Sequence, residues 1–169
     1  MGAADRRNAI LERLEGTTTP LPAARLGEDL GVSRQIIVGD VALLRASGHS
    51  IHATNRGYLL ARPTTRPRRS LTVQHTRGQI HTELSAILDA GGAVIDVSIE
   101  HRLYGQITVD LHLRTPEDVR AFLERLPVSS TLAELTNGWH THTLEAPSEA
   151  ILDDAVARLE ALGLTREPE

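Results

Sequence analysis

The sequence predicts an α+β protein in two parts: helices with a hairpin, then a domain with the order strand, helix, strand, strand, helix, strand, helix. Apolar residues follow a helical period up to about residue 46, whereas alternating and helical segments take turns after residue 71. Charge divides near the same place. Residues 1–70 hold 11 Arg and 6 acidic residues, and residues 71–169 hold 7 Arg and 16 acidic residues. This asymmetry favours a polyanion-binding module joined to a module that binds something else.

The composition excludes several kinds of site. One Phe, one Trp and two Tyr among 169 residues argue against binding by aromatic stacking on bases. The absence of Cys excludes disulfides and thiolate metal sites, so any metal must be held by His, Asp or Glu. No apolar run has membrane-spanning length, and residues 1–7 lack the apolar core of a signal peptide. We therefore expect a cytoplasmic protein that makes no membrane contact.

Residues 1–61 are predicted to form the first domain. Helical spacing predicts helices over 5–15, 23–30 and 34–46, with Ser33 as the N-cap of the last helix. Two short strands around the turn 54–57 then read as a hairpin. This is the order of a helix-turn-helix followed by a wing, although three small helices and a hairpin can also be a simple packing unit.

In a helix-turn-helix, residues at the N-terminal end of the last helix meet base edges in the major groove. Arginine there suits guanine and glutamine suits adenine, while an arginine in the wing suits a phosphate or the minor groove. The candidate DNA-binding residues are Ser33, Arg34, Gln35, Val38 and Arg56. The stretch 32–46, with Arg56-Gly57-Tyr58, resembles the winged helix of bacterial repressors of the biotin-repressor type.

Residues 62–70 combine prolines with four arginines and predict a linker, either resting near the DNA backbone or simply solvated. Residues 71–169 form the second predicted domain. Its pattern predicts a strand at 71–74, a helix at 77–90, strands at 93–99 and 106–113, a helix from Thr115, a strand around His140 and a helix from about Ser148. We expect a mainly antiparallel sheet with helices on one side.

The candidate metal ligands are His75, Glu83, His140 and His142. His140 and His142 are one residue apart in a strand-like run, so both rings would project from the same face. Nitrogen and oxygen ligands of this kind suit Zn, Ni, Fe or Mn, and can leave a position open for a small molecule. From spacing alone, paired histidines on a strand can equally be hydrogen-bonded or exposed.

Two motifs carry a further resemblance, residues 91–107 and the run 135–143 (Leu-Thr-Asn-Gly-Trp-His-Thr-His-Thr). Both resemble the three-histidine (3H) domain, and together with the winged helix they are similar to the niacin-responsive transcriptional repressors of the NiaR type. The resemblance implies an HPr-like βαββαβα regulatory domain, a divalent metal held by the four candidate ligands, and nicotinic acid as co-repressor. Arg102 departs from the family's His-Pro-x-Tyr-Gly motif, and this change affects the turn rather than the metal set.

We therefore expect a homodimeric repressor of niacin-uptake or NAD-synthesis genes that binds double-stranded operator DNA. His101 and Tyr104 either border the ligand pocket or shape the turn between two strands. In one alternative, the metal ion itself is the signal. The other alternative, a metal-dependent hydrolase, lacks a separate general base, a nucleophile motif and a phosphate-binding glycine loop, so we expect no enzyme activity.

Overall fold

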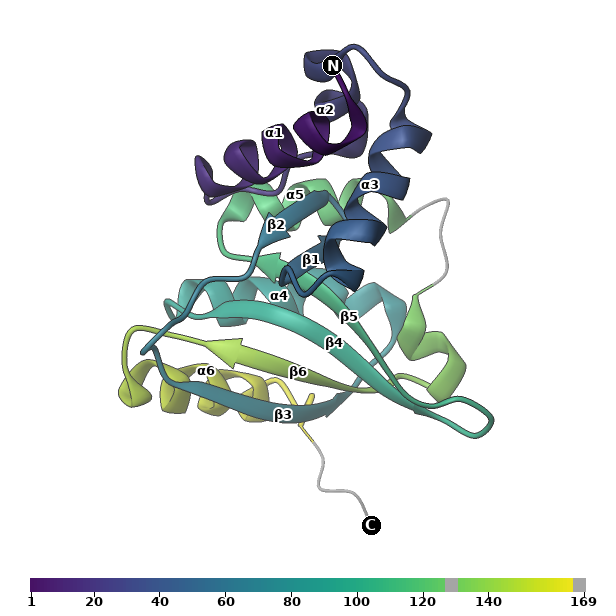
Figure 1. The fold of residues 1–169 in the computed structure, drawn as a ribbon. Coiled ribbons are helices and arrows are strands. Elements are labelled where there is room, and N and C mark those ends of the chain that lie inside the picture. Colours follow the sequence, from purple (N-terminus) through teal and green to yellow (C-terminus); the bar gives the residue numbers. More distant parts are fainter. Residues whose placement is uncertain (127–130, 166–169) are drawn as a thin grey trace. The chain divides into compact units, whose positions relative to one another are not determined.

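The computed structural model describes residues 1–126 and 131–165, and the chain divides into two compact units, Met1–Thr64 and Thr65–Glu169 (Figure 1). The predicted α+β class is confirmed. Residues 127–130 and 166–169 of the predicted regulatory domain lie outside the described residues. Within the described ranges, no helix is both long and apolar enough to cross a bilayer.

The N-terminal unit contains the predicted helices and hairpin. Its elements are α1 (Ala3–Glu15), α2 (Ala23–Leu30), α3 (Arg34–Ala46), β1 (Ile51–Thr54) and β2 (Gly57–Leu60). The two strands pair antiparallel around a tight turn. The core of the N-terminal unit is formed by apolar side chains from its helices and its hairpin: Ile10, Leu14, Ala23, Leu26, Ile37, Val41, Leu44 and Ile51. The predicted helix-turn-helix with a wing is thus confirmed.

Helix α3 is held at its start and at its middle. The Ser33 hydroxyl accepts a hydrogen bond from the Ile36 amide at 3.3 Å, which confirms the predicted N-cap. In the middle, the buried Asp40 carboxylate accepts from Arg6 of α1 at 2.5 Å and lies 3.5 Å from Arg7. The first two arginines of the chain therefore fix α3 to α1.

The C-terminal unit has the predicted βαββαβα order, and its described residues add two short 3-10 helices. Its elements are β3 (Arg68–Gln74), η1 (Arg77–Gln79), α4 (Ile80–Asp89), β4 (Ala93–His101), β5 (Gly105–Leu113), α5 (Pro116–Glu124), η3 (Leu132–Thr136), β6 (Trp139–Glu145) and α6 (Glu149–Ala161). Antiparallel pairing places these strands in the order β5, β4, β6, β3. The predicted antiparallel sheet is confirmed.

Helices α4, α5 and α6 cover one face of this sheet (Figure 1). The buried core between this sheet and the helices takes side chains from all four strands. It includes Val73, Leu84, Ile87, Val94, Leu113, Val119, Leu144, Leu152 and Leu159. Because side chains alternate along a strand, residues that share a face with Leu144 on β6 point toward the helices.

The structure departs from the predicted elements in three places. Strand β3 begins at Arg68 rather than Leu71, because Arg68 pairs with the buried Glu145 and Arg69 pairs with two acidic residues of α6. The predicted helix at 77–90 begins as the 3-10 turn η1, and α4 starts only at Ile80. The predicted loop before the His140 strand contains η3.

Candidate metal centre and DNA-binding surface

Strand β6 brings His140 and His142 to the helix-covered face. The strand alternates in burial, with His140, His142 and Leu144 buried and the residues between them partly exposed. The two rings lie edge to face, with centroids 4.9 Å apart. His140 is opposite Val73 of β3, and His75 follows that strand, so its ring comes within 4.7 Å of the His140 ring. Three histidines therefore meet at one end of two paired strands.

Glu83 enters from α4 and completes the cluster. Its side chain is about 2% exposed, and its Oε2 lies 2.5 Å from His75 Nε2. Its Oε1 lies 3.1 Å from His140 Nε2 and 3.0 Å from His142 Nε2. Because α4 starts at Ile80, Glu83 stands in the first turn of the helix, whereas the predicted helix start at residue 77 would place it nearly two turns in.

The turn before β6 sets the approach of His75. Asn137 and Gly138 adopt φ values of +52° and +87°, and the His75 amide donates to the Gly138 carbonyl at 3.4 Å. A Cβ atom on Gly138 would lie 2.4 Å from the His75 carbonyl oxygen, so only glycine permits this contact. Sequence reasoning gave Gly138 no role, although the Asn-Gly pair is itself a turn signal.

Backbone carbonyls orient all three rings. The Nδ1 atoms donate to the carbonyls of Thr76, Gly138 and Asp96, at 2.8, 2.9 and 2.8 Å from His75, His140 and His142 respectively. Since a carbonyl only accepts, each Nδ1 carries the hydrogen and each neutral ring presents the lone pair of Nε2. Three Nε2 atoms and one carboxylate thus converge on a buried point, where a cation or added protons must balance them.

The pKa values in the cluster shift in the directions that favour the charged forms of its residues. Burial lowers the pKa of His75 and His142, but the hydrogen bond and charge of Glu83, together with the backbone carbonyls of Thr76 and Asp96, outweigh it, so both pKa values are above that of free histidine. Burial raises the pKa of Glu83, yet the charge of His142 and the bonds from His140 and His75 hold it well below its usual range. The carboxylate is therefore ionised at neutral pH.

The donor set fits a divalent transition metal. Ligand atoms of His75, Glu83 and His140 all lie within 4.8 Å of one another. His142 Nε2 is buried and makes no well-directed hydrogen bond, although Glu83 Oε1 is close. A buried imidazole nitrogen without a well-directed hydrogen bond, beside a carboxylate oxygen, is a suitable metal ligand because a cation there would satisfy both groups. The four predicted ligands are thus brought together, and they can hold a metal.

A cavity of about 530 Å³ adjoins His75. Its lining includes Gln74, Thr76, Arg77, Gln79, Thr131, Glu134 and Asn137. The Arg77 guanidinium pairs with Glu134 at 2.8 Å, so a cation and an anion face the same opening. His101 and Tyr104, which we expected either to border the ligand pocket or to shape a turn, do not line this cavity. They stack on each other, with 5.0 Å between ring centroids, at the turn between β4 and β5.

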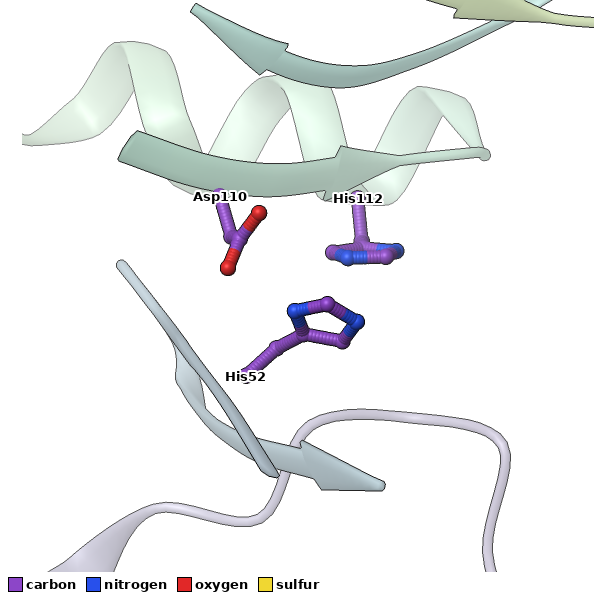
Figure 2. Close-up of side chains that lie close together, drawn as sticks. All are labelled: His52, Asp110 and His112. Carbon is purple, nitrogen blue, oxygen red and sulfur yellow. The ribbon is translucent and has the colours of Figure 1, made fainter. Parts of the chain in front are cut away.

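Strand β5 carries another histidine and acid. Figure 2 shows Asp110 and His112 leaving this strand on one side. Their neighbours Leu111 and Leu113 belong to the core beneath the helices. Asp110 and His112 therefore lie on the opposite face of the sheet from the His75 cluster, and take no part in it.

The candidate DNA-binding residues are placed around α3 and the hairpin turn. Arg34 and Gln35 are exposed in the first turn of α3, after the capping Ser33. Val38 is half-buried and packs against the N-terminal core. Arg56 is at the hairpin turn, where its amide donates to the Thr54 hydroxyl at 3.2 Å. The helix thus presents arginine and glutamine outward, while its other face is fixed.

Comparisons with known proteins identify both units. Residues 6–59 match the HTH domain family, and residues 68–167 match the 3H domain family. The chain is 37% identical to the probable transcription repressor NiaR of Thermotoga maritima, over 94% of this chain and 92% of the relative. It is 36% identical to the transcription repressor NadR of Bacillus subtilis, over 97% and 94% respectively. The chain therefore belongs to the NiaR/NadR family of transcription repressors, which combine a DNA-binding HTH with a 3H domain and are not enzymes.

Proposed function

We propose that this repressor binds its operator as a homodimer in the cytoplasm and senses nicotinic acid at a metal held by His75, Glu83, His140 and His142. The regulated genes would be those of niacin uptake or NAD synthesis. The observation that carries the proposal is the convergence of three Nε2 atoms on one ionised, buried carboxylate. No structural role in the core requires four polar groups at one point, since apolar side chains would fill it at lower cost.

The donor chemistry narrows the ion. Three imidazoles and one carboxylate suit Zn, Ni, Fe or Mn and do not suit Ca or Mg, which take oxygen ligands. The bound ion would supply a Lewis-acidic position for the carboxylate or ring nitrogen of nicotinic acid. What the chain itself supplies is ring orientation through three carbonyls and the exclusion of water from the cluster.

The cavity beside His75 supports a small polar ligand. Its volume of about 530 Å³ is ample for a pyridine carboxylate. The Arg77 guanidinium offers two parallel donors to a carboxylate, in exchange for its contact with Glu134. Nicotinamide has no negative charge, so the same site would discriminate against it.

Repression by a co-repressor requires coupling between ligand and operator. Nicotinic acid must bind the DNA-competent arrangement of the repressor more tightly than the arrangement that does not bind DNA. By linkage, operator DNA must then tighten nicotinic acid binding by the same factor by which nicotinic acid tightens operator binding. A dimer is expected because one winged helix reads too few base pairs for useful specificity. Sedimentation of the metal-loaded chain with and without a duplex checks the stoichiometry.

Isothermal titration calorimetry tests the ligand. Nicotinic acid is titrated into the whole chain, first metal-loaded and then chelator-treated, and the loaded titration is repeated with operator duplex present. We expect binding that needs metal, excludes nicotinamide and tightens with operator. Identical affinity with and without operator would show that the ligand is no co-repressor.

A second candidate is a metal-responsive regulator in which the ion is the signal. The burial of all four donor side chains, each no more than 5% exposed, favours it, because an enclosed ion can act on the fold without a further ligand. In that case operator binding follows metal concentration and ignores nicotinic acid.

A further inference from the structure

Ile36 is an apolar side chain on the outer face of α3. It is 43% exposed, in the first turn of the helix, directly after Arg34 and Gln35. A single exposed isoleucine is ordinary on a protein surface. This one, however, occupies the turn of an HTH recognition helix that lies against base edges, where an apolar group has one good partner, the methyl group of thymine.

Gly39 lies on the same side, one turn further along α3. It is inside a 13-residue helix, where glycine is less stable than alanine. A Cβ atom at this position would meet nothing within 4 Å, and the backbone does not have a positive φ. The fold of this unit therefore gives no reason for a glycine. Close approach by another molecule is the remaining use of a missing side chain.

The charges around α3 indicate which molecule that is. Arg6 and Arg7 are engaged by Asp40, and Arg25 pairs with Asp29. By contrast, Arg34 and Arg45 are exposed, and no partner for either is found among the described residues. They are about three turns apart on one side of the helix. At about 100° per residue, Ile36 and Gly39 lie on the opposite flank of the exposed face of α3 from Arg34 and Arg45. The helix thus offers cations to phosphates on one flank and an apolar, recessed strip to base edges on the other.

We propose that Ile36 reads the 5-methyl group of a thymine in the major groove, and that Gly39 lets α3 approach the bases closely enough for this contact. Ile36 and Gly39 are thereby specificity-determining residues of the DNA-binding surface, in addition to Arg34 and Gln35. The inference needs only the DNA-binding activity of the family and is independent of the ligand.

The Ile36 contact is tested with duplexes in which thymine is replaced by deoxyuridine, which lacks only the methyl group. A site is selected from random duplexes by the whole wild-type chain, and each dT is replaced in turn at fixed salt. We expect one replacement in each half-site to weaken binding about three- to fivefold. Ile36→Ala should bind the unmodified site that much more weakly and lose sensitivity to that replacement, while Leu43→Ala, another exposed apolar residue of α3, should keep it.

The outcome that overturns the Ile36 assignment is equal sensitivity to deoxyuridine in wild type and Ile36→Ala. Uniform weakening of selected and mixed-sequence duplexes by Ile36→Ala overturns it as well, because that pattern indicates a general contact. Since Ile36 is outside the core, Ile36→Ala should melt at the temperature of the wild type, which excludes unfolding as the cause.

Gly39→Ala distinguishes an effect on stability from an effect on DNA affinity. Alanine should raise the melting temperature of the N-terminal unit by about 4 to 8 °C. The same change should weaken binding to the selected site about five- to a hundredfold, because the methyl group collides with the groove. Ala42→Gly, on the next turn, lowers stability and measures what stability alone does to binding. Wild-type or tighter affinity in Gly39→Ala overturns the close approach.

Discussion

The two units use polar side chains in opposite ways. In the C-terminal unit, His75, Glu83, His140 and His142 are buried and make contact mainly with one another and with backbone carbonyls. In the N-terminal unit, Arg34 and Gln35 are exposed, and the buried Asp40 on the other side of the same helix is bound by Arg6. In the C-terminal unit, the residues proposed to bind metal are therefore also part of the buried structure. In the N-terminal unit, the candidate DNA-binding residues are separate from those that stabilise the fold.

This difference predicts how each unit responds to substitution. A change within the proposed metal cluster should alter stability and metal binding together. A change on the outer face of α3 should alter DNA binding and leave stability near that of the wild type.

The largest effect is expected from Glu83→Gln. This change removes the one negative charge among three imidazoles, so affinity for Zn²⁺ or Ni²⁺ should fall more than about a hundredfold, beyond the usual cost of losing an outer-shell partner. Calorimetric titration of the metal measures it. Glu117→Gln, an exposed acid paired only at 3.6 Å with Arg120, is the control and should bind metal normally. Tight binding by Glu83→Gln would remove this carboxylate from the ligand set.

Gly138→Ala tests whether the turn before β6 builds the site. The added Cβ collides with the His75 carbonyl, so unfolding free energy should fall by more than the roughly 1–3 kcal/mol of positive-φ strain, and metal affinity should fall with it. Gly105→Ala is the matched control, because its φ is +75° but nothing lies within 4 Å of its Cβ. It should show the strain alone and bind metal like the wild type, as denaturant and metal titrations can establish. Equal effects from both changes would mean that the His75 contact is unimportant.

Arg34→Ala and Arg56→Ala sharpen the description of the exposed surface. Loss of Arg34 should cost about 1–3 kcal/mol at particular base pairs and little elsewhere. Loss of Arg56 should weaken every sequence alike and reduce the salt dependence by about one phosphate contact. Binding to a panel of single-base operator variants at several salt concentrations distinguishes them, and the reverse pattern would exchange the two roles.

The smallest effect concerns pH. In metal-free protein, the raised pKa values of His75 and His142 mean that their pairs with Glu83 stabilise fully below about pH 6.5, and that this contribution is lost as pH rises through the folded pKa values. The lowered pKa of Glu83 gives a contribution that is present above about pH 4.3 and lost as pH falls through its folded pKa. The cluster therefore stabilises metal-free protein most between these limits.

Metal-loaded protein should show the opposite trend, since the ion displaces protons and binds better as pH rises. Denaturant unfolding between pH 5 and 9, with and without chelator, should give profiles that diverge as pH rises through the folded pKa values of His75 and His142. Parallel profiles would argue against a metal at these nitrogens.

The sequence predicted a large part of this arrangement because much of it is local. Alternation placed His140 and His142 on one face, and the Ser33 cap and the helical period located α3 within a residue. It did not predict what depends on contacts distant in the chain. The β3 and β6 register that sets Val73 opposite His140 is one example, and the close approach of Gly138 to His75 is another. Glu83 was a candidate ligand from its residue type and position, and the family resemblance implied that it shares one metal ion with the histidines.

Arginines illustrate the same limit. Residues 62–70 carry four arginines that composition alone assigned to a linker. In the structure, Arg62 donates to carbonyls at the C-terminal end of α1, including that of Glu15 at 2.7 Å, and Arg68 pairs with buried Glu145. Charge counts cannot distinguish an arginine that stabilises the fold from one that is free for DNA, because the difference lies in partners far along the chain.

The most direct measurement is operator binding by fluorescence anisotropy, on a duplex from upstream of a niacin-uptake or NAD-synthesis gene, at fixed salt. Metal and nicotinic acid are varied independently, with nicotinamide as the control ligand. We predict that nicotinic acid tightens binding only when metal is present, and that chelation or Glu83→Gln abolishes the effect. Tight binding that follows metal concentration and ignores nicotinic acid would contradict the proposed co-repressor and identify the ion as the signal.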